Sequence, residues 1–195
     1  MTARGEPVEL SKIALLLIDV QMAFVHRDAA GEPRSTPLAE GNISRLLDGF
    51  RNAGGRIVHI HHHSRQAGSP FITGQPGAVV QEFAEPAPGE AVYIKHVNAS
   101  FIGTSLEDDL RRAGVERLIL CGATANQCAE STARMAGNLG FNTFFVSDGV
   151  WAYGNTGPDG REHSADEVLS LTIGNLHGEF ATIRSTEEIL ALLGS

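Results

Sequence analysis

The stretch Ile13-Ala14-Leu15-Leu16-Leu17-Ile18 is a short, entirely apolar run that ends at an acidic residue, Asp19. A run of this length with no polar alternation is typical of a strand that is buried on both faces of a parallel sheet. Five more segments along the chain favour strands for similar reasons. They are residues 56–61, 91–95, 118–121, 143–146 and 180–183, the last being the weakest of the set.

Helical patterns fill most of the intervals between these strands. Ile43, Leu46, Leu47 and Phe50 share one helix face, and Gly54-Gly55 ends that helix. Further helices are predicted over residues 106–113, 126–139, 164–176 and 187–193, the third of these opening with a capping-box pattern.

Strands that alternate with helices predict right-handed βαβ units and a sheet covered on both sides. We therefore expect one α/β domain over residues 1–195, with three αβα layers and a mostly parallel sheet of six strands. Residues 21–37, 64–90 and 149–163 are predicted to be long loops. Loops of this length in a compact domain are usually functional or mobile.

Composition excludes several classes of protein. The 195 residues are 42% hydrophobic and 19% charged, which is ordinary for a globular chain. The net charge of −8 offers no basic footprint for nucleic acid or an anionic membrane. No apolar run approaches the roughly 20 residues of a membrane helix, and residues 1–11 lack a signal-peptide core. Two cysteines exclude a disulfide scaffold and fit a reducing compartment, so we expect a cytoplasmic protein.

Polar residues follow three of the predicted strands. Asp19 ends the first, Lys95 ends the third, and the turn Gly122–Cys128 follows the fourth. In an open parallel sheet these carboxyl ends meet at one edge. Taken singly, an acidic residue there is often a turn residue, a lysine usually reaches solvent, and a cysteine is most often inert. Cys121, inside an apolar strand, fits the inert reading.

Cys128 differs because it lies near the start of a predicted helix. Free N–H groups and the helix dipole favour a thiolate there, and a nearby Lys95 is expected to lower the pKa further. Asp19 is then placed to take the thiol proton and return it to a leaving group.

Together these segments resemble a known family, the isochorismatase-like cysteine hydrolases. The resemblance covers about residues 13–193, and its specific part is the Asp…Lys…Cys set with its surroundings. The segments that carry it are Ala14-Leu15-Leu16-Leu17-Ile18-Asp19-Val20-Gln21, Lys95 with Ser100-Phe101-Ile102-Gly103-Thr104, Gly122-Ala123-Thr124-Ala125-Asn126-Gln127-Cys128 with Thr132 and Ala136, Phe145-Val146-Ser147-Asp148-Gly149, and Ser164-Ala165.

The resemblance implies a catalytic triad of Asp19, Lys95 and Cys128. It also implies a cis peptide between Ala123 and Thr124, with the backbone N–H groups of Thr124 and Cys128 forming an oxyanion hole. The implied activity is hydrolysis of a C–N bond in a small amide through a thioester, with no cofactor.

One stretch departs from the family. Nicotinamidases of this family bind a metal through an Asp-x-His motif after the second strand, whereas this chain has His59-Ile60-His61-His62-His63 and no carboxylate there. Histidines bind zinc, but adjacent ones on a strand point in different directions. We expect one or two to line the pocket, no native metal, and activity that survives metal removal. Candidate pocket residues are Phe24, His62, Phe101 and Trp151. Ala129, after the cysteine, is a second departure.

Two other functions stay open at this point. Vinyl-ether hydrolysis of an isochorismate-like substrate is one, although relatives with that activity work without the cysteine. A non-catalytic ligand-binding domain is the other, and its expected mark is loss of Asp19, Lys95 or Cys128, all of which are present. We expect a homo-oligomer, because aromatic residues in the long loops otherwise leave apolar patches in water.

Overall fold

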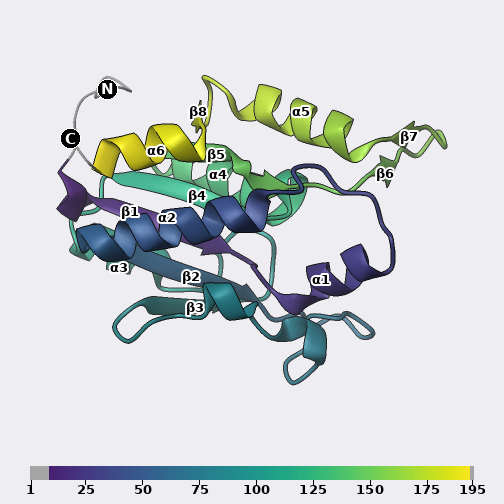
Figure 1. The fold of residues 1–195 in the computed structure, drawn as a ribbon, viewed down its shortest axis with the longest axis horizontal. Helices are drawn as coiled ribbons and strands as arrows, with labels where there is room; N and C mark the ends of the chain where they lie inside the picture. The colour runs from purple at the N-terminus through teal and green to yellow at the C-terminus, as the bar shows by residue number, and fades with distance from the viewer. Residues whose placement is uncertain (1–8, 194–195) are drawn as a thin grey trace.

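Six parallel strands form one sheet in the computed structural model, which describes residues 9–193 (Figure 1). The strand order is β3-β2-β1-β4-β5-β8. This confirms the predicted sheet and all six strand positions, although three strands extend beyond the predicted cores and the last begins two residues later than predicted. Their bounds are β1 (Ile13–Ile18), β2 (Arg56–His62), β3 (Ala91–Lys95), β4 (Arg117–Ala123), β5 (Asn142–Trp151) and β8 (Thr182–Arg184).

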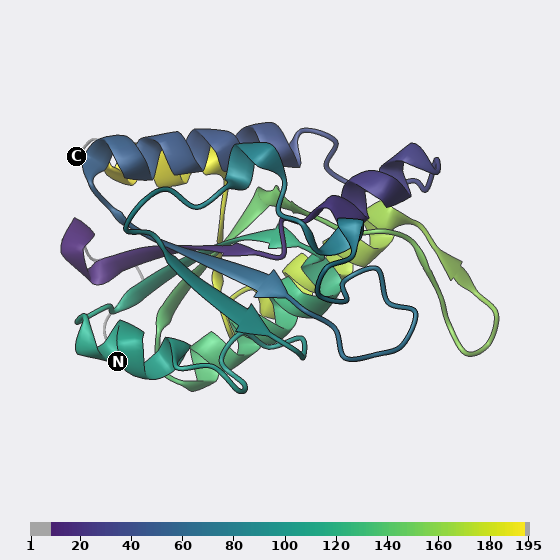
Figure 2. The same cartoon turned by 90° about the horizontal axis from the view of Figure 1, so that it is seen from below.

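Helices cover both faces of this sheet, as Figure 2 shows. The helices α2 (Ala39–Ala53) and α6 (Thr186–Leu193) lie on one face, and α3 (Leu106–Arg112), α4 (Glu130–Asn138) and α5 (Ala165–Leu176) lie on the other. Alternate residues of β1 supply the two cores: Leu15 and Leu17 pack toward α2, whereas Leu16 and Ile18 pack toward α3 and α4. The apolar run is therefore continuous because both faces of β1 are buried.

The three predicted loops contain short ordered elements. The segment 21–37 includes α1 (Met22–Ala29), which begins without a side-chain cap at Gln21. Two 3₁₀ turns, η2 (Pro76–Ala78) and η3 (Glu82–Ala84), lie in 64–90, and another, η1 (Leu10–Lys12), precedes β1. In 149–163, β5 continues to Trp151, and β6 (Asn155–Thr156) pairs with β7 (Glu162–His163) in a ribbon that projects from the body (Figure 1).

The predicted helix over 126–139 is divided in two. Its first turn is a π-helix, η4 (Ala125–Ala129), and α4 follows it directly. Single π turns occur frequently at functional sites. The capping box at the start of α5 is present as predicted: Ser164 accepts a hydrogen bond from Glu167 N, and the Glu167 side chain accepts one from Ser164 N.

Parallel pairing places the carboxyl ends of β1, β2, β3 and β4 at one edge of the sheet. Asp19, Lys95 and η4 therefore lie at this edge, as the sequence predicts. The register of β2 and β3 also pairs His62 directly with Lys95. No helix among residues 9–193 has the length and apolar character needed to span a membrane.

Candidate active site

A buried ion pair forms the centre of the site. Lys95 Nζ lies 2.7 Å from Asp19 Oδ2, and the two side chains are 0% and 2% exposed. Asp19 has a left-handed backbone (φ 53°), a conformation that is uncommon outside glycine. The backbone changes direction at Asp19, which ends the alternation of side chains along β1. The Asp19 carboxylate thereby reaches the Lys95 ammonium at the end of β3. Backbone outliers of this kind cluster at functional sites.

The Asp19 carboxylate has one engaged and one free oxygen. Oδ1 is buried with no nitrogen or oxygen partner within residues 9–193, and a hydrogen bond from the Cys128 thiol to the carboxylate contributes to the pKa of Asp19. Burial raises the pKa of Asp19, and the positive charge of Lys95 opposes that rise. A carboxylate with a raised pKa is a stronger base than one in water. The free oxygen is thus suited to accepting a proton.

Cys128 lies on η4, half-buried beside this pair. Burial, with the negative charge of Asp19 next, raises the pKa of the Cys128 thiol to about 12, whereas Lys95 lowers it. Burial thus opposes the thiolate that a position near a helix start favours. The resting sulfur therefore carries a proton, and Asp19 is the nearby group that can take it.

Cys121 has a different environment. It lies inside β4 with no exposed surface, and its Sγ donates to the Leu16 carbonyl at 3.7 Å. Burial alone raises the pKa of this thiol. These properties agree with the prediction that Cys121 is an inert core residue.

The turn between β4 and η4 is tightly defined. The peptide between Ala123 and Thr124 is cis, as the family resemblance implies. The Thr124 carbonyl accepts hydrogen bonds from Gln127 N and Ala129 N. These bonds use the carbonyl of Thr124 and not its N–H group. Just before the turn, Gly122 has φ +113°, and a Cβ there would lie 2.0 Å from the Ile18 carbonyl oxygen. Only glycine permits this close approach of β4 to β1.

His62 is the candidate pocket residue that touches the ion pair. Its Nδ1 lies 3.3 Å from Lys95 Nζ. Gln21 holds the backbone of His62 at two points, because Gln21 Oε1 accepts from His62 N and Gln21 Nε2 donates to His62 O. Gln21 belongs to the first segment that resembles the family, but no sequence pattern predicts that it holds His62.

The aromatic candidates separate into two groups. Phe24 is buried and makes ring contacts with Phe71 and Trp151, with centroids 5.3 and 5.6 Å apart. Phe71 in turn packs edge-on against His62, at 5.5 Å. Phe101 lies elsewhere, stacked on Phe141 in the core beneath α3. Phe71 is thus the aromatic side chain that contacts His62, while Trp151 is fully buried behind Phe24.

The remaining histidines of the run do not form a metal centre. His59 Nε2 bonds Glu90 at 2.7 Å, and His63 Nδ1 bonds the Thr73 hydroxyl. His61 Nε2 is buried without a partner in the described chain. Within residues 9–193, no three His, Cys, Asp or Glu side chains are grouped to hold an ion. The donor set therefore does not fit the metal that nicotinamidases of this family bind.

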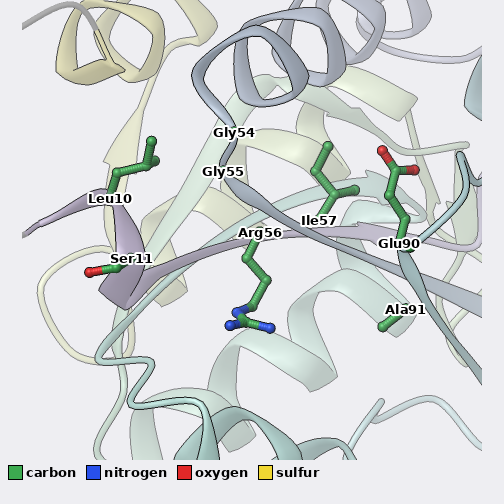
Figure 3. A pocket seen from close by; sticks show the side chains of 9 residues that line it. Leu10, Ser11, Gly54, Gly55, Arg56, Ile57, Glu90 and Ala91 are labelled. Carbon is green, nitrogen blue, oxygen red and sulfur yellow. The ribbon is translucent and has the colours of Figure 1, made fainter.

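A separate pocket of about 390 Å³ lies at the opposite end of the sheet, near the start of β2 (Figure 3). Arg56 and Glu90 both line it, but their side chains extend in opposite directions (Figure 3). Glu90 is already engaged by Arg51 and His59. The pocket thus lacks converging polar groups and is remote from Asp19 and Lys95.

The fold and the site at the carboxyl ends of the strands define the class of protein. It is a three-layer α/β domain with a buried carboxylate–ammonium pair next to a cysteine. Comparisons place it more narrowly. The family model for the isochorismatase domain matches residues 13–185, and the chain belongs to that family.

Three relatives illustrate the match. The isochorismatase family protein YrdC of Bacillus subtilis (strain 168) is 35% identical over 179 residues, which cover 92% of this chain and 95% of YrdC. An isochorismatase-family crystal structure from Chromobacterium violaceum ATCC 12472 superposes with a TM-score of 0.90 at 39% identity, covering 97% and 98% of the two chains. Maleamate amidohydrolase of Pseudomonas putida is 28% identical over 186 residues, covering 88% of this chain and 83% of that enzyme.

Proposed function

We propose that this protein hydrolyses the C–N bond of a small amide through a thioester on Cys128. The observation that carries the proposal is the buried Asp19 carboxylate, whose pKa is raised and whose Oδ1 has no nitrogen or oxygen partner, beside a protonated thiol. A base and a protonated nucleophile in one dry site are what general-base attack on a carbonyl requires. The maleamate amidohydrolase relative supports an amide as the substrate.

The reaction divides into two halves. Asp19 takes the thiol proton as Cys128 Sγ attacks the carbonyl carbon, and the backbone N–H groups of Thr124 and Cys128 stabilise the oxyanion. Asp19 then gives that proton to the leaving nitrogen, the C–N bond breaks, and ammonia or an amine departs. Water next attacks the thioester while Asp19 accepts its proton, and that proton returns to the sulfur as the acid product leaves.

Lys95 contributes charge and position. Its ammonium binds Asp19 Oδ2 and so fixes the carboxylate with Oδ1 free for proton transfer. Its charge also favours the thiolate that forms during attack, which is the direction in which it shifts the pKa of Cys128. No step requires a metal ion.

A chemical trap tests the proposal. A panel of small amides is screened for ammonia release before and after dialysis against EDTA, and the best substrate is mixed with excess enzyme for intact-mass analysis. We expect an acyl adduct on Cys128, sensitive to hydroxylamine, and no turnover by Cys128→Ala. Hydrolysis by Cys128→Ala at the wild-type rate contradicts the thioester route and favours vinyl-ether-type chemistry instead.

We further propose that the protein is cytoplasmic, in keeping with its two free cysteines, and that it forms a homo-oligomer.

A further inference from the structure

The contact between Lys95 and His62 fixes the protonation of the imidazole. An ammonium group has only donors, so Lys95 Nζ donates and His62 Nδ1 accepts across their 3.3 Å separation. Nδ1 therefore carries no proton. The ring is neutral, and its hydrogen is on Nε2.

Two neighbours also hold His62 in position, one through its backbone and one through its ring. Gln21 engages both the N–H and the carbonyl of His62, at 2.8 and 3.2 Å, and is itself anchored to the Ala78 carbonyl at 2.8 Å. Phe71 packs edge-on against the imidazole. A donor whose backbone and ring are both fixed is preorganised to recognise a ligand.

Nε2 of His62 is the free end of this arrangement. Within residues 9–193, this nitrogen makes no hydrogen bond. Because it is absent from the buried polar atoms that lack a partner, it is exposed to solvent. His61 is the contrast, because its Nε2 is buried without a partner. The two neighbouring imidazoles thus differ: the ring of His62 contacts Lys95 through Nδ1 and has its Nε2 open to solvent, whereas Nε2 of His61 is buried.

We propose that His62 is a specificity residue whose Nε2–H binds a hydrogen-bond acceptor on the substrate, at a position separate from the scissile amide. This inference rests on the proposed amide hydrolysis. Donation by the Lys95 ammonium to Nδ1 polarises the ring and strengthens the donor at Nε2. The substrate class is therefore an amide with a second acceptor, either a carboxylate or a neutral acceptor such as a ring nitrogen.

Two pairs of amides distinguish these acceptors. Maleamate is compared with (Z)-but-2-enamide, which lacks the carboxylate, and nicotinamide is compared with benzamide, which lacks the ring nitrogen. We expect the wild-type protein to favour the acceptor-bearing member of at least one pair by about tenfold or more in kcat/KM, as for one polar hydrogen bond.

Two isosteric substitutions separate the contacts of the imidazole. His62→Asn puts its amide oxygen near the Nδ1 position, so it keeps a partner for Lys95 and loses the donor toward the substrate. His62→Gln reaches the Nε2 position and restores an N–H there. We expect Asn to reduce the preference, measured as the ratio of kcat/KM within each pair, to below about threefold, and Gln to keep most of it. His177→Asn, at the exposed residue that follows α5, is the control.

Failure of this inference differs from failure of the proposed function. Unchanged preference in His62→Asn overturns the role of His62 while amide hydrolysis stands. If the wild-type protein cleaves none of the four amides, the same compounds are tested as ligands that protect Cys128 from iodoacetamide, which requires no turnover. Protection by maleamate or nicotinamide that His62→Asn removes supports the His62 contact. Protection that is equal in both proteins, or absent, overturns it.

Discussion

Lys95 and Asp19 are 76 residues apart in sequence, yet their charged groups are 2.7 Å apart and excluded from solvent. Burial of two charges is costly, and their mutual attraction offsets that cost only while both partners are present. The pair thus links catalysis to stability, because loss of either residue leaves an uncompensated charge in the site.

This coupling is measurable with a double-mutant cycle. We expect Asp19→Asn and Lys95→Met each to lower the free energy of unfolding by about 3–5 kcal/mol, and the double variant to lose less than the sum. Urea titration followed by fluorescence of Trp151, the single tryptophan and a fully buried one, measures this. Additive losses contradict a direct pair. Both single variants are also expected to lose amide hydrolysis.

Thiol labelling tests the charges around the sulfur. Cys128 is half-buried with a pKa of about 12, so we expect slow alkylation at pH 7 that accelerates as the pH rises. The wholly buried Cys121 reacts more slowly still. Because the Lys95 charge lowers the pKa of Cys128, loss of that charge slows labelling at pH 8. Iodoacetamide labelling with peptide mass analysis gives the rates, and faster labelling of Cys121 contradicts the assignment.

The sequence predicts this edge of the sheet because hydrophobic runs identify strands and parallel topology brings their carboxyl ends together. Asp19 and Lys95 follow from that rule. The neutral state of Cys128 does not, because burial depends on packing that a helix start does not reveal. The His62–Lys95 contact depends on the register of β2 against β3, which two short apolar segments leave undefined.

Helix α1 also escapes sequence reasoning. It has eight residues, only two buried side chains, Ala23 and Phe24, and no side-chain cap at Gln21. Such a helix is marginal by itself and depends on tertiary contacts, among them the hydrogen bond from the Tyr153 hydroxyl to the Phe24 carbonyl. Capping motifs predict α5 well for the opposite reason, since Ser164 and Glu167 form their bonds locally.

Gly122 provides a steric test of the turn before Cys128. A methyl group there would meet the Ile18 backbone at 2.0 Å, and φ is +113°, so we expect Gly122→Ala to destabilise the fold by more than about 3 kcal/mol. Gly174, in α5, has no atom within 4 Å of a new Cβ. Gly174→Ala is the matched control and should add about 0.5–1 kcal/mol through helix propensity. Urea midpoints compare the two, and a stable Gly122→Ala protein with unchanged activity contradicts the close approach.

We propose a homo-oligomer that forms through the edge strand β3 and not through the aromatic residues of the long loops. The aromatic loop residues Trp151 and Tyr153 are buried within the chain and leave no apolar patch. Val92 and Ile94 are exposed instead, at 45% and 47%, on the edge strand β3. An edge strand with apolar side chains can pair with a second copy about a two-fold axis. We expect light scattering above 20.7 kDa at micromolar concentration, and a shift toward monomer in Ile94→Lys. A monomeric wild-type protein contradicts the proposal.

The polar network around Glu90 predicts a pH-dependent contribution to stability. The Arg51 guanidinium, the Ala87 N–H and the His59 ring all bind this carboxylate and hold its pKa at about 2. Since the folded pKa lies below the ordinary value of 4.5, the contribution is complete above pH 4.5 and is lost as the pH falls toward 2.

Glu90→Gln should therefore cost about 1.5–3 kcal/mol at pH 7, and the difference from wild type should shrink below pH 4.5. Glu116→Gln removes an exposed partner of Lys12 and should cost at most about 1 kcal/mol. Urea unfolding from pH 3 to pH 7 separates the two, and a Glu90→Gln cost that stays constant over that range contradicts the linkage.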